Sequence, residues 1–185
     1  MSYHICWRGD VMHEVDIKSL QLNPWSLFGD RWALITAGNE CDGFNTMTAA
    51  WGHFGTLFSL RGGSLNTTIC YIRPQRYTKV FMDSHDTYTL SFFPDTAEYK
   101  KKLAHLGARS GRDEDKVAHV GLTPKFLEGT TTFEEASLVF VCRKIYVDDL
   151  AEENFIDVGI VEKNYPLRDF HTRYIGEILK VYVAD

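Results

Sequence analysis

The sequence predicts a mainly β domain, a β-barrel that carries helical insertions. Aromatic residues, which suit a pleated and half-buried surface, make up 14% of the 185 residues. Short apolar segments bounded by turn residues recur in both the first and the last third of the chain. Between them, residues 96–127 are charged and begin with helical spacing. Strands on either side of a central helical insert are typical of an antiparallel barrel or sandwich with added helices.

The expected strands follow from composition and from the turn signals that end them. They cover residues 30–39, 46–60, 64–74, 87–94, 136–149 and 171–185. Glycines predict bends in the second strand and at Gly176 in the last one. Helices are expected at residues 77–86 and 96–111, the latter stopping at Gly107. Residues 112–126 read as charged and then turn-like, and residues 155–166 fit a short helix or a strand.

Bulk composition excludes several classes of protein. The length suits one compact domain, residues 1–185. A net charge of -5 and a pI of about 5.8 argue against nucleic-acid binding. No apolar run is long enough to span a membrane, and the N-terminus lacks the pattern of a signal peptide. We therefore expect a cytoplasmic protein in which Cys6, Cys41, Cys70 and Cys142 are free, buried thiols.

The segment GFNTMTAAWG, residues 43–52, is the first candidate site. A core strand does not need an asparagine and two threonines so close together, and a surface loop does not need Met47 and Trp51. Small residues let a flat ligand lie against the backbone, and the hydroxyls and amide offer donors. The alternative is a polar strand end before a turn.

The segment RPQRYT, residues 73–78, is the second candidate. Arg73 and Arg76 precede an expected helix start at Thr78. Free backbone N–H groups at a helix start, together with a guanidinium, suit phosphate. The alternative is a pair of solvated arginines beside a capping threonine.

Other catalytic signatures are missing from the sequence. The histidines show neither HxH nor HExxH spacing, so we expect no metal site. The chain has no GxSxG segment, no P-loop and no Rossmann fingerprint.

Taken in order, the motifs resemble the flavin reductase-like family, in particular its flavoredoxin-type branch. The matching segments are NPWSLFGDRWALITAG, GFNTMTAAWG, YIRPQRYTK, TYTLSFFP, SGRDEDK with GLTP, and HTRYIGEI. They extend from about residue 22 to the C-terminus. The proline-containing SxSxxPP segment of many two-component reductases is replaced here by GHFGTLFSLRGG, which puts that role in doubt.

The resemblance implies an FMN-binding split barrel that forms a homodimer. It implies that the flavin ring edge and ribityl chain lie against Asn45, Thr46, Met47, Thr48, Ala49 and Ala50. Trp51 would pack near the isoalloxazine. The phosphate would be held by Arg76, Tyr77, Thr78 and Lys79. His171 is the one candidate catalytic residue, because its segment would approach the flavin or a nicotinamide, here or in the neighbouring subunit.

The activity implied is an FMN-dependent oxidoreductase that takes hydride from NAD(P)H. Electrons would pass to free flavin or to a protein acceptor. The protein need not supply an acid or base, because the flavin carries the chemistry. One alternative is a flavoredoxin-like electron carrier with little NAD(P)H turnover. Another is a barrel that binds a different planar ligand or serves only as a structural dimer.

Overall fold

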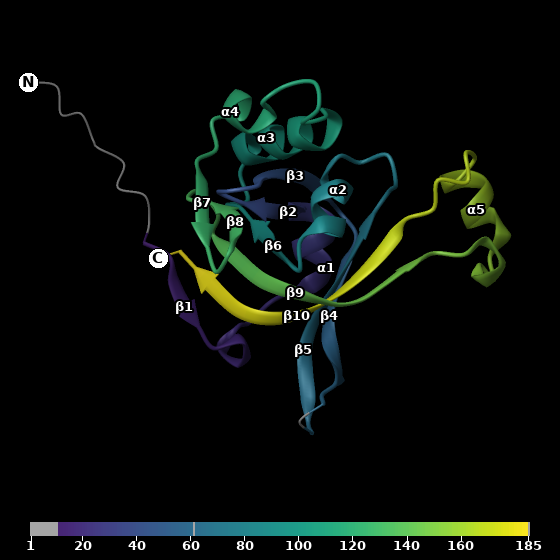
Figure 1. The fold of residues 1–185 in the computed structure, drawn as a ribbon, viewed down its shortest axis with the longest axis horizontal. Coiled ribbons are helices and arrows are strands. Elements are labelled where there is room, and N and C mark those ends of the chain that lie inside the picture. Colours follow the sequence, from purple (N-terminus) through teal and green to yellow (C-terminus); the bar gives the residue numbers. More distant parts are fainter. Residues whose placement is uncertain (1–10, 61, 185) are drawn as a thin grey trace, which may run out of the picture.

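The computed structural model describes residues 11–60 and 62–184, and its main feature is a long, curled antiparallel sheet (Figure 1). The strand order is β3-β2-β6-β9-β10-β5-β4, and β1 pairs with the far end of β10. The strands are β1 (His13–Val15), β2 (Ala33–Asn39), β3 (Gly43–Ala49), β4 (Gly52–Phe58), β5 (Ser64–Ile72), β6 (Thr87–Phe92), β9 (Leu138–Asp149) and β10 (Thr172–Val183). A separate hairpin joins β7 (Pro124–Leu127) to β8 (Thr130–Phe133).

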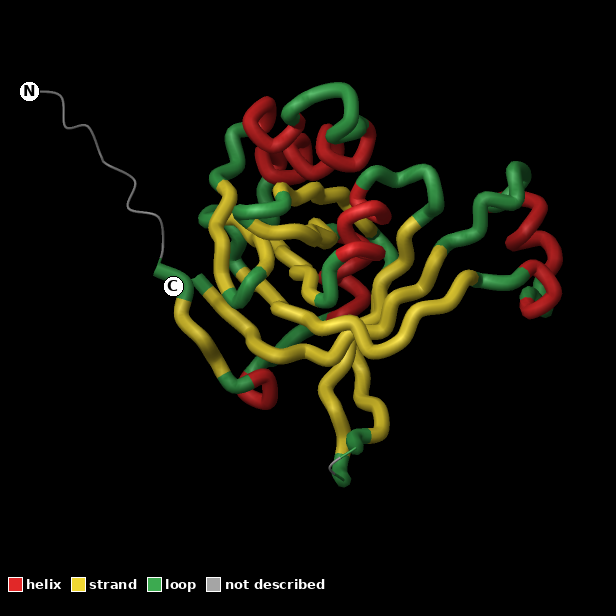
Figure 2. The backbone as a smooth tube through the Cα atoms, viewed as in Figure 1, coloured by secondary structure: helices red, strands yellow, loops and turns green. Residues whose placement is uncertain are grey.

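The helices are short, and Figure 2 shows them both in the middle of the molecule and at its periphery. They are α1 (Pro24–Ser26), α2 (Thr78–Ser84), α3 (Ala97–Ala108), α4 (Lys116–Val120) and α5 (Val158–Asn164), with single turns η1 (Ile17–Ser19), η2 (Leu27–Arg31) and η3 (Glu152–Asn154). α3 and α4 cover the end of the sheet above β2 and β3. The β4–β5 hairpin projects from the body, and α5 lies at the tip of an arm between β9 and β10. Within the described part of the chain, none of these helices has the length and apolar character that crossing a bilayer requires.

Apolar residues are buried on both faces of the central strands. Ile35 and Phe140 belong to the core inside the curled sheet, whereas their neighbours Leu34 and Val139 pack on the other face, beneath α3 and the β7–β8 hairpin. Alternate residues of a strand point to opposite faces, so burial on both faces requires an almost continuous apolar run. This explains why β2 is buried from Ala33 to Gly38 and β9 from Leu138 to Cys142.

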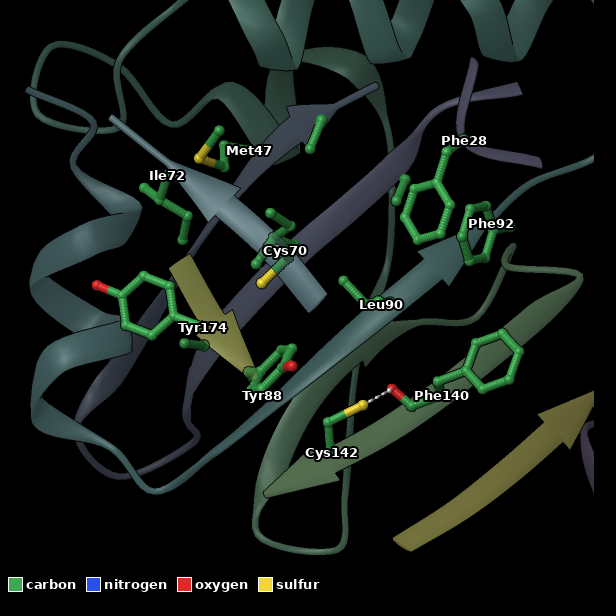
Figure 3. Packing of buried hydrophobic residues seen from close by; sticks show 14 of the residues in the cluster. Phe28, Met47, Cys70, Ile72, Tyr88, Leu90, Phe92, Phe140, Cys142 and Tyr174 are labelled. Carbon is green, nitrogen blue, oxygen red and sulfur yellow. Dashed lines mark hydrogen bonds between the residues drawn. The ribbon is translucent and has the colours of Figure 1, made fainter. Parts of the chain in front are cut away.

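Figure 3 shows the inner core, where Tyr88 lies beside Cys70 and Cys142. A Cβ at Gly176 would come within 2.3 Å of the Tyr88 hydroxyl, so glycine at this position makes room for the phenol. Burial raises the pKa of the Cys70 thiol to about 12, which keeps it protonated and unreactive. The prediction of free, buried thiols is confirmed for Cys70 and Cys142 and is wrong for Cys41, which is exposed. Cys6 lies outside the described residues.

The mainly β prediction is confirmed, and β10 has an irregularity at Gly176 as expected. Three local predictions need correction. The expected strand 46–60 is two strands, β3 and β4, because the chain turns at residues 50–51. α4 replaces part of the expected turn region. The Asp115 side chain caps its start by accepting from the Ala118 N–H, and Gly121, with φ +63°, ends it. β7 and β8 were not expected; Glu128 and Gly129 both adopt positive φ and form their tight turn.

Candidate functional site

A pocket of about 190 Å³ opens where β3, β5 and β10 meet. Its lining consists of Met47, Thr48, Ala49, Ala50, Trp51, Tyr71, Arg73, Arg76 and His171. Sheet register explains the meeting point. Ile72, the last residue of β5, pairs with Thr172, the first residue of β10. Arg73 follows Ile72 and His171 precedes Thr172, so this pairing brings Arg73 and His171 together. The pocket is therefore built from three segments that are distant in sequence.

His171 forms one wall of this pocket together with aromatic rings. Its ring centroid lies 5.0 Å from that of Trp51, and its Nδ1 is 2.8 Å from the Tyr165 hydroxyl. Burial, reinforced by the Arg73 guanidinium, lowers the pKa of His171 to about 4. The imidazole is therefore neutral at neutral pH. It offers one N–H donor and one acceptor rather than a positive charge.

A second pocket of about 110 Å³ adjoins the first and shares Met47 and Arg76 with it. The other residues that line it are Asn45, Gln75, Tyr77, Thr78, Ala108, Arg109, Ser110 and Lys116. Asn45 donates its side-chain N–H to the Thr78 hydroxyl at 2.7 Å. Gly111 packs against Asn45 so closely that a Cβ there would lie 2.1 Å from the amide oxygen. The loop that follows α3 therefore closes this end of the groove.

The second pocket is positively charged. Arg76 donates to the Gly107 carbonyl at 2.7 Å, and Lys116 donates to the carbonyls of Leu106 and Arg109 at 2.9 and 3.1 Å. These acceptors carry no full charge. The carboxylate that acts on Lys116 is that of Glu114, which lies outside the pocket lining and affects the Lys116 pKa less than burial and Arg76 do. Lys116 is only 4% exposed, and desolvation, followed by the nearby Arg76, lowers its pKa to about 8. Among the described residues that line the two pockets, none is Asp or Glu.

Ten of the residues expected from the sequence line one of the two pockets. They are Asn45, Met47, Thr48, Ala49, Ala50, Trp51, Arg76, Tyr77, Thr78 and His171. Thr48 gives its hydroxyl to the Leu103 carbonyl at 2.5 Å, which leaves its backbone as the part available to a ligand.

Two expected residues lie apart from these linings. Thr46 is buried on the opposite side of β3, where its hydroxyl contacts Thr36 and the Ile35 carbonyl. Strand alternation accounts for this, because Asn45 and Met47 face the pocket. Lys79 contacts Asp83 at 2.8 Å and the Tyr174 hydroxyl at 3.2 Å.

The structure adds residues that were not singled out from the sequence. Lys116 and Arg109 line the charged pocket from the segment after α3. In the sequence, Lys116 belongs to a stretch expected to be charged and then turn-like, and Arg109 to the expected helix 96–111. Arg73 belongs to the RPQRYT segment, but the resemblance implies no role for it in holding the phosphate. In the structure Arg73 pairs with Asp169 at 2.5 Å and lies over the Tyr165 ring. Only the SGRDEDK segment as a whole gave a signal that this region belongs to the site.

A larger, mainly apolar pocket of about 660 Å³ adjoins the first and shares Ala50, Trp51 and Tyr71 with it. Its other residues are Pro24, Trp25, Phe28, Gly29, Gly52, His53, Phe54, Leu150, Phe155, Ile160 and Tyr165. Trp25 is 84% exposed and Trp51 is 48% exposed. This concentration of aromatic rings at the open side of the groove is unusual for a free surface.

Comparison with known proteins identifies the fold. No family model matches the sequence, and no curated protein matches it. Solved structures do match. One is the FMN-binding domain of a flavin reductases-like enzyme from Shewanella baltica OS155, with a TM-score of 0.61, 13% identity, and coverage of 95% of this chain and 78% of that one. The chain has the split-barrel fold of these flavin-binding domains.

Two further structures share this split barrel. Flavoredoxin of Desulfovibrio vulgaris (Miyazaki F) matches with a TM-score of 0.60 and 21% identity over 94% of this chain and 78% of that one. A protein from Shewanella frigidimarina NCIMB 400, assigned as a flavin reductase with a split barrel domain, gives a TM-score of 0.61 and 19% identity over 91% and 77%. At such identities the likeness establishes the fold, and the ligand has to be argued from the site.

Proposed function

We propose that the chain is an FMN-binding member of the flavin reductase-like group and acts as an NAD(P)H-dependent oxidoreductase. The observation that supports this most strongly is the pair of joined pockets. One end is lined by cations and by no Asp or Glu among the described residues, and the other is walled by backbone, small residues and aromatic rings. FMN has the same division, with a dianionic phosphate at one end and a planar ring at the other.

The donor set fits the phosphate of FMN. Arg76, Arg109 and Lys116 supply positive charge, and the Ser110 and Thr78 hydroxyls supply neutral donors. Hydrogen bonds between such cations and a phosphate are short and strong. Because Arg76 and Lys116 are already held in place by backbone carbonyls, little side-chain freedom would be lost on binding.

The ring would lie in the first pocket against Ala49, Ala50 and the neutral His171. Small side chains let its edge approach the strand backbone, where N–H groups can donate to it. When bound, FMN supplies hydride and electron transfer, which this chain's own side chains do not. Trp51 and Tyr71 bound the open side, so a nicotinamide ring would enter there, next to the larger apolar pocket.

The visible spectrum of the purified protein, followed by anaerobic addition of NADH or NADPH, tests the proposal. We expect flavin absorption bands that bleach rapidly with one of the two nucleotides. Bands that persist until dithionite is added would replace the reductase with an electron carrier of the flavoredoxin type. A protein that fails to take up added FMN would refute the flavin site itself.

We also propose that two copies of the chain associate through the apolar pocket. Its aromatic residues adjoin the flavin groove, and burial of such a patch on a partner would remove it from water.

A further inference from the structure

Three side chains with metal-binding atoms converge outside the flavin groove. They are His105 near the end of α3, Glu114 in the following loop, and His119 in α4. One ligand atom from each lies within 4.8 Å of the other two. His105 Nε2 is already 2.7 Å from Glu114 Oε1, and the two imidazole rings are 4.2 Å apart between centroids. We propose that these three residues form a binding site for a borderline divalent cation, with Zn²⁺ as its best occupant.

The chemistry of the donor set selects the ion. Two imidazoles and one carboxylate are ligands that Zn²⁺ prefers, and three protein ligands leave a fourth position for water. Hard cations such as Mg²⁺ favour oxygen ligands and would bind poorly here. The flanking carboxylates of Asp113 and Asp115 add negative charge nearby in the chain, while Lys116 turns its ammonium to the carbonyls of Leu106 and Arg109.

One local rearrangement is required. The two imidazoles are stacked with an angle of 5° between their planes, and a metal ion must lie near the plane of each ring that binds it. A single ion cannot lie in two parallel planes, so one ring has to turn. His119 is exposed and His105 is half-buried, so His119 is the ring that is free to turn about its χ2 angle.

The position of the site gives it a structural role. Its ligands come from α3, the loop and α4, which are the segments that carry Arg109, Ser110 and Lys116 into the charged pocket. An ion held by all three segments would fix the loop that closes that pocket. The sequence did not indicate a metal site, because the two histidines are 14 positions apart in the chain and only the fold of α4 back onto α3 brings them together.

Calorimetric titration of the chelator-treated full chain with ZnCl₂ tests the proposal. Cys6 and Cys41 are first replaced by Ser, because free thiols also bind Zn²⁺. We expect one Zn²⁺ per chain and no binding of Mg²⁺. Loss of a residue that only hydrogen-bonds to a metal ligand typically weakens metal affinity by roughly 10–100-fold. His119 would be a ligand itself, so His119→Ala should weaken Zn²⁺ binding by about 100-fold or more. Glu114→Gln should weaken it as well.

His85→Ala is the matched control, because His85 also lies near a carboxylate, that of Asp42 at 3.5 Å. It should leave Zn²⁺ affinity unchanged. A rise in melting temperature with Zn²⁺ that disappears in His119→Ala would support the site independently. Absence of stoichiometric binding, or equal affinity in His119→Ala and the unsubstituted chain, would overturn the proposal.

Discussion

A half-buried arginine and a buried lysine are the residues that define the candidate site. Arg76 and Lys116 both donate to main-chain carbonyls rather than to carboxylates, and both lie at the closed end of the groove. Placing a charge away from water is costly unless something compensates it. An anionic ligand would provide that compensation, whereas a purely structural role would be served equally well by a neutral donor.

Arg76→Ala should weaken FMN binding much more than riboflavin binding, because riboflavin has no phosphate. Loss of a charge-assisted contact costs about 1.5–3 kcal/mol, which corresponds to a roughly 10–150-fold change in dissociation constant. Flavin fluorescence titrations would measure both ligands. Lys79→Ala is the control, since Lys79 contacts Asp83 and Tyr174 instead of lining the pocket, and it should affect neither ligand. An equal loss for both flavins would remove Arg76 from the phosphate site.

His171 should make the flavin-free protein sensitive to mild acid. Its pKa is about 4 in the folded chain, against 6.5 for an ordinary histidine. Between these values the unfolded chain binds more protons, so the free energy of unfolding should fall as the pH is lowered from about 6.5 to about 4. Since one pKa unit is worth ~1.4 kcal/mol, a shift from 6.5 to about 4 sets an upper limit of about 3.5 kcal/mol on the loss.

Urea unfolding of the unsubstituted protein and of His171→Gln, repeated across this pH range, isolates the contribution of His171. The amide keeps a hydrogen-bonding partner for the Tyr165 hydroxyl without titrating. The difference in unfolding free energy between the two proteins should therefore change across the range. Parallel pH profiles would show that His171 does not titrate in this window.

At the scale of elements, strand β10 is shaped by one close contact. Gly176 faces the Tyr88 hydroxyl, and the pairing of β10 with β9 is irregular between Ile175 and Gly176. A bulge of this kind bends a strand and increases its twist. The curl of the sheet around the inner core is thus coupled to the packing of a buried tyrosine.

Gly176→Ala should destabilise the protein by about 1–3 kcal/mol, the usual cost of forcing extra volume into a packed core. Thermal or urea unfolding measures this. Adding Tyr88→Phe should recover part of the loss, because the hydroxyl 2.3 Å from the new methyl group is removed. Gly55→Ala in β4 is the control, since a Cβ there meets nothing within 4 Å. A loss as large at Gly55 as at Gly176 would contradict the role of the tyrosine contact.

At the scale of the whole molecule, the sheet leaves an apolar pocket open beside the flavin groove. We expect a homodimer that covers it. Trp25→Glu would place a charge in that interface and should shift the protein to monomers in sedimentation velocity. Val11 is an exposed apolar residue outside the pocket, so Val11→Glu should leave the dimer intact. A monomeric unsubstituted protein, or a Trp25→Glu dimer, would argue against this interface.

Local sequence patterns predict the fold class and most of the strands of this protein. The apolar runs of β2 and β9 are short, bounded by turn residues and rich in residues that favour strands, and that information is local. GFNTMTAAWG and RPQRYT are candidate sites because they combine residue types that a core does not need, and the resemblance to the flavin reductase-like family then implied ten of the residues that line the groove, His171 among them. Sequence patterns did not predict α4 or the β7–β8 hairpin. Single capping residues mark α4 and a two-residue turn marks the hairpin, and these signals are too short to identify either element.

The closure and the charge of the groove depend instead on contacts between distant parts of the chain. Lys116 belongs to a stretch expected to be charged and then turn-like, yet it is buried because the loop after α3 folds against Asn45. Likewise, the neutral state of His171 depends on burial and on Arg73, which strand register brings beside it. Charge state and pocket shape depend on contacts between residues far apart in the chain, and local sequence patterns do not encode those contacts.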